Sequence, residues 1–514
     1  MVVVRVLLGL SLLLAGCHNG PSTVPSGPPS TGPTSAAATA ASSPTTAASP
    51  ARTCPQPPAA APAPLPWNAG YLEPARTIKL ASPSHCRLDD GVIDLQDSAT
   101  VAHRPGPSGA LVRSVLPTMV PPRHYLHVDG LLLGIPRSTG TNYLFRAIDA
   151  RDGSVRWEQP SRSGIPNVHE AARAGGVVVE YVEYDYGQQP DELVALDRAT
   201  GQVRWRRPQK PRTVHHLVGT AEQVIVLQHN GELTALSSTD GSVLWRDTKV
   251  PSPREDWRDR VDIAAAGGRL FVGVSRRALR VLDAATGTER HQQPIEDGVN
   301  GVAASGDTGY AILRDAGTDQ LSVVAIDLDC GGRRWQTQVP TAEFRGDGPL
   351  TVGADGIYGC GGWGRLFALH RTSGAPAWRY DLARCDPRFA PVVLPSVGAR
   401  PESLLVRAEG DSELLLFEPG AALVQPLAVT IQGQVRAEGK PPQEGFTVTA
   451  GGAKGTTDKR GRYQITTQAR GMLWVLVTGK PALGGDFHCP DVNLRLAGRQ
   501  RHTVNVQCKR VYRH

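Results

Sequence analysis

Short apolar runs separated by glycine turns dominate the middle of the chain. In one such stretch the apolar run Leu193–Leu196 is followed by the turn Thr200-Gly201, after which Val203 and Trp205 resume the apolar pattern. Runs of this kind, bounded by turn residues, predict antiparallel strands joined by hairpins, with the glycine free to take a positive φ. The pattern therefore predicts an all-β fold.

The stretch Ala195–Trp205 recurs along the chain with a period in the forties. Each copy has a small apolar residue, Asp or a substitute two positions later, a glycine turn, and usually Trp ten positions after the first residue. The copies begin and end at Ala147 and Trp157, Ala195 and Trp205, Ala235 and Trp245, Val281 and His291, Ala325 and Trp335, and Ala368 and Trp378. A period of this length is typical of a β-propeller with one blade per repeat.

The joint recurrence of turn, Asp and Trp resembles the repeat of the pyrroloquinoline-quinone-like propeller superfamily. The resemblance implies a propeller over residues 67–427. A blade cannot bury both of its faces alone, so we expect the large tryptophan side chains to fill the gaps between neighbouring blades. The tryptophans concerned are Trp157, Trp205, Trp245, Trp335 and Trp378.

The repeat by itself does not fix the number of blades. Six recognisable repeats and a degenerate one around Ser403–Phe417 predict seven blades, with eight as the alternative. Residues 67–118 contain strand-like pieces but no copy of the repeat. We expect one of these strands to complete the blade begun at the C-terminal end of the propeller, which closes the ring and leaves no sheet edge open.

The first residues have the features of an export signal. Arg5 precedes an apolar run, Val6–Leu14, that is too short to span a bilayer stably. The run ends in Leu14-Ala15-Gly16-Cys17, which resembles the lipobox of bacterial lipoproteins. The resemblance implies that residues 1–17 form a lipoprotein signal, that Cys17 is diacylated, and that the protein is anchored to a membrane. The alternative is an ordinary cleaved signal peptide. By the sorting rule of lipoproteins in some Gram-negative bacteria, Asp after the lipidated Cys retains the protein at the inner membrane. Because His18 stands at this position, the resemblance favours the outer membrane.

Residues 18–66 are rich in Pro, Ser, Thr and Ala and carry almost no charge. Such a segment cannot bury enough apolar area to offset the entropy of ordering it. We therefore expect a disordered tether that holds the folded part away from the membrane.

A different pattern begins after Leu427. Val429–Val435, Gly439-Lys440-Pro441 and the turn Thr457–Tyr463 resemble the opening of a carboxypeptidase regulatory-like domain, which is a prealbumin-type β-sandwich. The resemblance covers residues 428–514 and implies an accessory domain rather than a peptidase. We expect Asp458–Gly461 to form a turn and Tyr463 to pack into the sandwich.

The chain has eight cysteines, of which Cys17 is assigned to lipid. Export implies an oxidising setting, so we expect disulfides among the rest. Cys489 with Cys508 is the first expected pair, and its short loop would contribute about 3 kcal/mol in the chain-entropy model. Cys54 with Cys86 and Cys360 with Cys385 come next, which leaves Cys330 over. A competing arrangement pairs Cys330 with Cys360, and spacing does not decide between the two.

Some members of the resembled superfamily bind a quinone, so an enzyme is one hypothesis. Such quinoproteins use calcium, a carboxylate base and often a disulfide between adjacent cysteines, and this sequence has no adjacent cysteine pair. The repeat carboxylates Asp149, Asp197, Asp283 and Asp327 fall at equivalent blade positions, which favours a turn or strand-end role. Glu180, Glu183 and Asp185 are expected to line a loop at a blade edge. We assign no catalytic residue, no metal site and no cofactor. Pyrroloquinoline quinone and calcium belong only to the dehydrogenase alternative.

The formal net charge of +7 over 514 residues is scattered along strands and turns, without a basic block that would predict a nucleic-acid partner. We expect a non-enzymatic, exported binding or scaffold lipoprotein that presents its propeller surface to a protein partner in the cell envelope. In this it resembles propeller lipoproteins of outer-membrane assembly. Two alternatives remain open: a quinone-dependent dehydrogenase, and a binder of cell-surface glycan through arginines and exposed aromatics such as Trp257 and Trp363.

Overall fold

A computed structural model gives the fold of this chain. It describes part of the sequence, and residues 1–73, which include the expected signal and tether, lie outside that part. The described residues are 74–79, 85–87, 92–95, 100–105, 111–116, 125–128, 131–134, 144–149, 154–160, 166–184, 190–210, 213–249, 261–318, 320–339, 350–361, 365–382, 392–394, 402–407, 413–418, 421–438, 444–451, 453–478, 487–490, 492–496 and 500–510.

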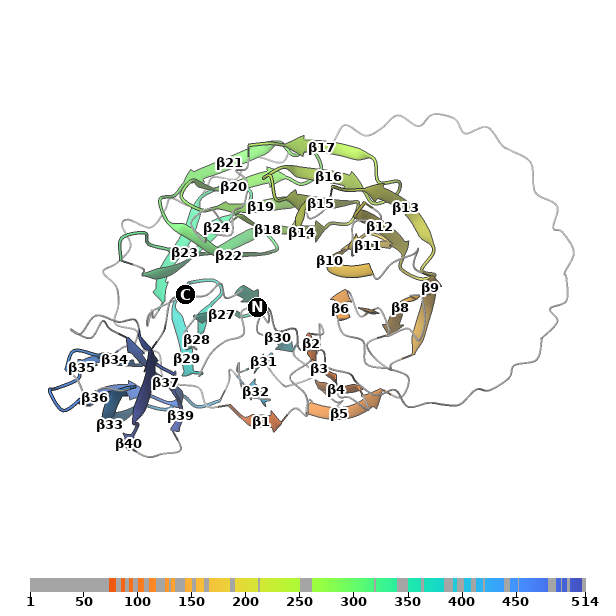
Figure 1. The fold of residues 1–514 in the computed structure, drawn as a ribbon. Coiled ribbons are helices and arrows are strands. Elements are labelled where there is room, and N and C mark those ends of the chain that lie inside the picture. Colours follow the sequence, from red (N-terminus) through yellow and green to blue (C-terminus); the bar gives the residue numbers. More distant parts are fainter. Residues whose placement is uncertain are drawn as a thin grey trace, which may run out of the picture. The chain divides into compact units, whose positions relative to one another are not determined.

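The described residues up to Phe417 form eight antiparallel groups of four strands, which we number as blades 1 to 8 (Figure 1). Blade 1 consists of β2 (His85–Arg87), β3 (Val92–Leu95), β4 (Thr100–Pro105) and β5 (Leu111–Leu116). Blade 2 consists of β6 (Tyr125–Val128), β7 (Leu131–Gly134), β8 (Leu144–Asp149) and β9 (Val155–Pro160). Blade 3 consists of β10 (Pro166–Ala174), β11 (Val177–Tyr184), β12 (Glu192–Asp197) and β13 (Val203–Pro208). Blade 4 consists of β14 (Val214–Gly219), β15 (Gln223–Gln228), β16 (Leu233–Ser237) and β17 (Val243–Asp247).

The remaining blades follow in chain order except for one strand. Blade 5 consists of β18 (Val261–Ala266), β19 (Arg269–Val274), β20 (Ala278–Asp283) and β21 (Glu289–Pro294). Blade 6 consists of β22 (Gly298–Ser305), β23 (Thr308–Arg314), β24 (Leu321–Asp327) and β25 (Arg333–Val339). Blade 7 consists of β26 (Leu350–Val352), β27 (Gly356–Gly361), β28 (Arg365–His370) and β29 (Pro376–Asp381). Blade 8 consists of β30 (Val392–Leu394), β31 (Ser403–Arg407), β32 (Glu413–Phe417) and the early strand β1 (Arg76–Lys79).

The N-terminal strand β1 completes the last blade. It pairs antiparallel with β32, with Arg76 opposite Leu416. The expectation that an early strand closes the propeller is therefore confirmed. The described residues hold eight blades, one more than the seven expected and equal to the alternative. The difference arises because residues 85–116 carry no copy of the repeat and yet form the whole of blade 1.

Burial follows the position of a strand within its blade. The innermost strands of successive blades lie beside one another, so the middle strands are covered on both faces. All seven residues of β24 are buried, whereas the outermost strand β17 alternates between buried and exposed positions. The seams from blade 2 to blade 8 are thus mainly apolar layers in the described part of the chain.

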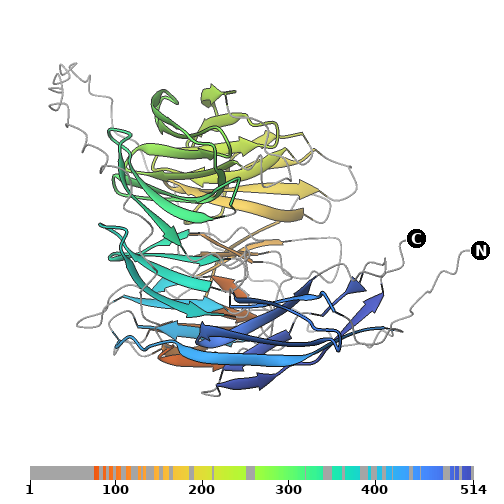
Figure 2. The ribbon, with the colours of Figure 1, turned by 90° about the vertical axis from the view of Figure 1, so that its left-hand side faces the viewer.

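The C-terminal strands (blue in Figures 1 and 2) form one further sheet and an extension of the blade 7 sheet, which Gly471 joins by pairing parallel with Asp381 of β29. In one, β33 (Leu427–Ala437) pairs with β36 (Arg462–Ala469), β40 (Arg501–Thr503) and β41 (Val506–Arg510), and β41 pairs with β38 (Phe487–His488). In the other, β37 (Gly471–Thr478) pairs with β34 (Thr447–Ala450) and β39 (Val492–Leu496), and β34 pairs with β35 (Ala453–Thr456). Residues from both sheets share one hydrophobic core.

Three sequence expectations fall in this region. Asp458 accepts backbone hydrogen bonds from Arg460 and Arg462, so Asp458–Gly461 is a turn, as expected. Tyr463 is buried and its hydroxyl donates to the Val504 carbonyl, at 2.8 Å. Cys489 and Cys508 form a disulfide. The likeness to carboxypeptidase regulatory-like domains stays a prediction.

Every element in the described ranges is a strand, so they offer no helix of membrane-spanning length and hydropathy.

Candidate functional site

The repeat occupies the last two strands of blades 2 to 7, in one register. Ala195 lies directly opposite Trp205 across β12 and β13, and a β-bulge follows at Leu196. The first and last positions of the other five copies pair in the same way, each followed by a register shift. The bulge increases the local twist and so directs the tryptophan toward the next blade.

Each repeat tryptophan of blades 2, 3, 4 and 6 is bound to the turn of the following blade. The indole Nε1–H donates to a main-chain carbonyl there, at 2.9 to 3.2 Å. The turn glycine of that blade lies against the ring, so a Cβ on Gly201 would lie 2.4 Å from Trp157. The acceptor residues for Trp157, Trp205, Trp245 and Trp335 are Arg198, Ser238, Ala284 and Arg371. In blade 7, Trp378 stacks on Phe417 of blade 8.

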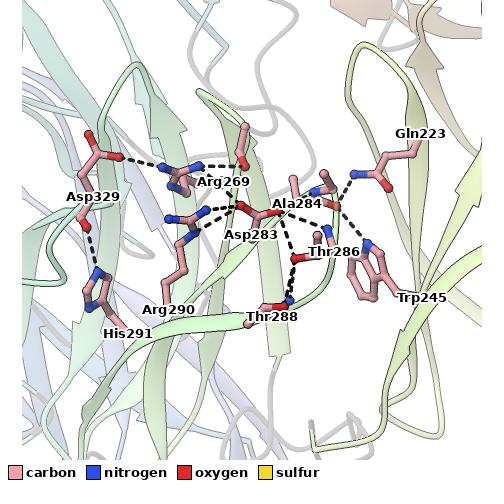
Figure 3. A network of polar contacts seen from close by, with 12 residues as sticks. Gln223, Trp245, Arg269, Asp283, Ala284, Thr286, Thr288, Arg290, His291 and Asp329 are labelled. Atoms are coloured by element: carbon pink, nitrogen blue, oxygen red, sulfur yellow. Dashed lines mark hydrogen bonds and ion pairs between the residues drawn. The ribbon is translucent and has the colours of Figure 1, made fainter. Parts of the chain in front are cut away.

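His291 takes the tryptophan position in blade 5. Its Nε2 lies 2.8 Å from the main-chain carbonyl of Asp329 in blade 6, so this nitrogen carries the proton (Figure 3). Gly331 lies against the ring. Arg269 reaches the Asp329 carboxylate at 3.2 Å and so adds an ion pair to the same seam (Figure 3). The smaller ring therefore keeps the hydrogen bond of the repeat while covering less of the neighbouring blade.

The repeat aspartates bind their own hairpins. One oxygen of Asp197 accepts the backbone N–H groups of Ala199 and Thr200, and the other accepts Arg204 at 2.6 Å. The hydrogen bond from the Arg204 guanidinium lowers the pKa of Asp197 to about 2. Equivalent Asp–Arg pairs join Asp149 to Arg156, Asp283 to Arg290, and Asp327 to Arg334. These carboxylates therefore have the turn role that the sequence favours.

A calcium and quinone site does not fit these residues. Calcium takes several carboxylate and amide oxygens that converge on one point. The four repeat aspartates are instead each bonded to an arginine of the same hairpin. Within the described ranges, no group of three or more His, Cys, Asp or Glu side chains is placed to hold a metal ion.

Glu180 does not lie in a loop at a blade edge, and that expectation is wrong. It is a residue of β11 with 1% of its surface exposed, and its carboxylate oxygens have no hydrogen-bond partner. Within β11 it lies on the same face as Val178 and Val182, which pack with Trp157 between blades 2 and 3. Burial raises the pKa of Glu180 to about 8. Glu183 belongs to the same strand, and Asp185 lies outside the described residues.

Cys330 is disulfide-bonded, so it is not the cysteine left over. The competing arrangement, which gives Cys330 a partner, accounts for this bond better than the first. Several other candidate side chains lie outside the described residues, namely those of Cys17, Cys54, Cys86, Cys360, Cys385, Trp257 and Trp363.

Two concavities lie at opposite strand ends of the seam between blades 3 and 4. A groove of ≈ 730 Å³ follows the ends of β10 and β14, where Gly175 donates to the Thr220 carbonyl at 3.1 Å. The groove is lined mainly by small residues and main chain, with Arg173 as its charged side chain.

The second concavity, which we call the Arg207 pocket, has a volume of ≈ 450 Å³. It lies at the strand ends where blade 3 connects to blade 4 and where β15 turns into β16. Its lining residues are Leu193, Arg207, Pro208, Gln209, Lys210, Thr213, Val226, Gln228, Asn230, Glu232, Thr234, Leu236 and Arg246.

The Arg207 pocket combines an apolar floor with a cationic rim. Leu193, Val226 and Leu236 are buried members of the seam between blades 3 and 4. Three cations and one carboxylate line the pocket, which gives these residues a net charge of +2. The carboxylate is that of Glu232, which accepts the Thr234 hydroxyl at 2.9 Å and lies 3.6 Å from Arg246.

Arg207 has a fixed position in this pocket. It is half-buried, and its Nη1 donates to the Gly241 carbonyl of blade 4 at 3.3 Å. Lys210, on the segment that leads to β14, is exposed. Neither Arg207 nor Lys210 is part of the repeat or of a motif in the sequence. The available signal was the residue two positions after each repeat Trp, which is Arg207 here and Asp247 in the next copy.

Comparison with known proteins identifies the kind of repeat. Residues 141–380 match a family model described as outer membrane protein assembly factor BamB. The chain is 23% identical over 251 residues to the outer membrane protein assembly factor BamB of Yersinia pestis, which covers 46% of this chain and 61% of the relative. It is 30% identical over 170 residues to the serine/threonine-protein kinase AfsK of Streptomyces griseus, covering 30% of this chain and 20% of the kinase. The chain thus spans less than two thirds of either relative.

Two solved structures align with this chain at low sequence identity. BamB from Moraxella catarrhalis aligns with a TM-score of 0.42 and 15% identity, covering 68% of this chain and 99% of that one. The quinohemoprotein alcohol dehydrogenase ADHIIG from Pseudomonas putida HK5 aligns with a TM-score of 0.44 and 13% identity, covering 71% of this chain and 80% of the enzyme.

The fold and the match define an all-β protein with a β-propeller. Residues 141–380 within it form a BamB-like repeat region of the pyrroloquinoline-quinone-like type.

Proposed function

We propose that this protein is an exported binding scaffold, which holds a polypeptide partner in the cell envelope on the surface of its propeller. The Arg207 pocket is the observation that carries this proposal. The repeat residues bind the neighbouring blade or their own hairpin. The residues on the rim of the pocket instead differ from copy to copy and reach solvent. A concave site with an apolar floor and a few fixed polar groups is suited to recognition.

The partner class is inferred from the relatives. The Yersinia relative is named as an outer membrane protein assembly factor, and the family model that matches residues 141–380 has the same description. A role in envelope assembly, through contact with another protein, is accordingly the finer form of the proposal.

Membrane attachment is the second part of the proposal. The sequence Leu14-Ala15-Gly16-Cys17 supports lipidation at Cys17, and the segment 18–66 supports a tether of adjustable reach. Two or more acyl chains give stable anchoring. The scaffold would thus act at a membrane surface, with the outer membrane favoured by His18.

Site-specific photo-crosslinking in cells tests the binding function. A photo-reactive amino acid is placed at Gln209, on the rim of the Arg207 pocket, and as a control at the exposed Ala285, in the turn between β20 and β21 of blade 5. We expect a protease-sensitive adduct of defined mass from Gln209 and none from Ala285. Absence of protein adducts at Gln209 and at Asn230 would refute a polypeptide partner at this site.

The dehydrogenase alternative has its own test. The chain without its signal is titrated with pyrroloquinoline quinone and calcium, and thermal unfolding is followed. We expect no shift of the unfolding temperature. A stoichiometric interaction that stabilises the protein would overturn the scaffold assignment.

A further inference from the structure

We propose that the Arg207 pocket binds an acidic polypeptide segment, in which an Asp or Glu side chain pairs with Arg207 and Lys210 while an adjacent apolar side chain lies on the floor. This inference rests on the proposed scaffold function and names the chemistry of its partner.

One neighbouring seam fills the equivalent place with an ion pair of the chain's own. In the seam between blades 4 and 5, Asp247 stands two positions after the repeat Trp and pairs with Arg280 at 2.7 Å. Both side chains are buried, with 8% and 6% of their surface exposed, so the chain supplies its own anion and its own cation there.

The register places Arg207 where Asp247 stands and Thr234 where Arg280 stands. Arg207 follows Trp205 by two positions, and Thr234 precedes the first repeat residue, Ala235, by one. In the seam between blades 3 and 4, the cation Arg207 therefore stands where the other seam has its carboxylate. Across from it stands the hydroxyl of Thr234, where the other seam has its arginine. A pocket of ≈ 450 Å³ opens at this point.

The one carboxylate in the pocket does not neutralise Arg207. Glu232 is engaged by the Thr234 hydroxyl and by Arg246, on the blade 4 side. The Arg207 guanidinium donates to the neutral Gly241 carbonyl, at 3.3 Å. An incoming carboxylate would thus meet a fixed guanidinium and the flexible ammonium of Lys210, which is the donor set that planar acids favour.

The floor distinguishes a polypeptide from a free anion or an anionic glycan. The exposed Pro208 offers apolar surface beside the charged rim, above Leu193, Val226 and Leu236, which are at most 1% exposed. An acidic side chain next to an apolar one satisfies both the rim and the floor, whereas a sugar polymer leaves the floor without a matching group.

Peptide binding to the purified chain lacking its signal tests the proposal. The probes are a fluorescently labelled peptide of Gly-Leu-Glu repeats and its Gly-Leu-Gln counterpart, compared by anisotropy at low and high salt. We expect the Glu peptide to bind more tightly, and salt to weaken it. Arg207→Gln and Lys210→Gln should each weaken binding about tenfold or more, since each removes a hydrogen bond to a charged group.

Arg204→Gln is the matched control. Arg204 lies on the same strand, β13, and loses the same charge, but it pairs with Asp197 outside the pocket. We expect binding to survive this change and to survive Arg207→Lys in part. The double variant Arg207→Asp with Thr234→Arg copies the pair of the next seam, so it should keep the unfolding temperature and lose the peptide.

Three results of the binding experiment would overturn the acidic-segment assignment, and one result of the crosslinking experiment would do so as well. The first is equal binding of the Glu and Gln peptides, and the second is an equal effect of Arg207→Gln and Arg204→Gln. The third is tighter, Arg207-dependent binding of polygalacturonate than of the peptide, which would make a glycan the occupant. Protein adducts at Gln209 that persist in Arg207→Gln would leave the scaffold standing and refute only the acidic segment. Their absence in the unaltered protein would refute the scaffold itself.

Discussion

Trp245 of blade 4 lies flat against Gly287 of blade 5. A Cβ on Gly287 would lie 2.6 Å from the indole carbons Cδ2 and Cε3, closer than any real contact of this kind. The indole Nε1 donates to the Ala284 carbonyl at 2.9 Å in the same turn (Figure 3). One glycine thus serves both the turn of its own hairpin, with a φ of 70°, and the packing of the blade before it.

Gly287→Ala should therefore destabilise the protein through two separate effects. The methyl group would strain a backbone at positive φ, and it would push Trp245 off the blade, for a total cost of about 3 kcal/mol. Gly268→Ala is the matched control in the same blade, because its φ is 73° and nothing lies within 4 Å of the added carbon. We expect Gly268→Ala to cost only about 1 kcal/mol. Denaturant unfolding measures both, and equal costs would contradict a packing role for Gly287.

His291→Trp should stabilise the seam between blades 5 and 6. The ring site is complete, since Gly331 has a φ of 72° and faces the imidazole, and a carbonyl acceptor stands at Asp329. A larger ring would bury more apolar surface, which we expect to contribute about 1 kcal/mol. Calorimetry should show a higher unfolding temperature. Trp245→His, the reverse change one blade earlier, should lower it, and a loss of stability in His291→Trp would argue against interchangeable ring sites.

The repeat spacing predicted blades 2 to 7 and the docking of their tryptophans, because turn, Asp and Trp each perform a local task that fixes their distance in sequence. Blade 1 could not be predicted in this way. Its last two strands, β4 and β5, have neither the Asp nor the Trp of the repeat in their sequence. The blade count consequently came out one too low.

The pocket and Glu180 escaped prediction for a different reason. Whether Arg207 faces a hydroxyl or a carboxylate depends on which residue of the next repeat lies across the seam, and this follows only from aligning the copies through the bulge. Glu180 is followed closely by Glu183 and Asp185, and this acidic group favours a loop, although strand alternation directs Glu180 into the seam with Val178. Tertiary pairing, rather than local propensity, decided both.

Asp247→Ala should cost much more than Asp197→Ala. Arg280 is 6% exposed and binds Asp247 across the seam, so removal of the acid leaves a buried charge with only Glu289 as its ion partner, at a cost of about 3 kcal/mol. Arg204, which binds Asp197, is 58% exposed, and loss of that pair should cost at most about 1 kcal/mol. A double-mutant cycle with Arg280→Met separates the pair from its surroundings. Coupling below that of Asp197 with Arg204 would contradict the seam pair.

The stability of the propeller should fall as the pH rises from about 5 to about 8, because of Glu180. Burial raises the pKa of this carboxyl from 4.5 to about 8, so the folded protein keeps a proton that the unfolded chain releases. The contribution of Glu180 to the free energy of unfolding is therefore fully present below pH 4.5. It is lost as the pH rises through 8, by up to about 1.4 kcal/mol per pH unit. Glu180→Gln should remove this slope and raise the unfolding temperature more at pH 8 than at pH 5, whereas Glu222→Gln, at an exposed position, should leave both unchanged. Thermal unfolding across this pH range decides the matter, since an unaltered slope in Glu180→Gln would mean that the carboxylate finds a partner when ionised.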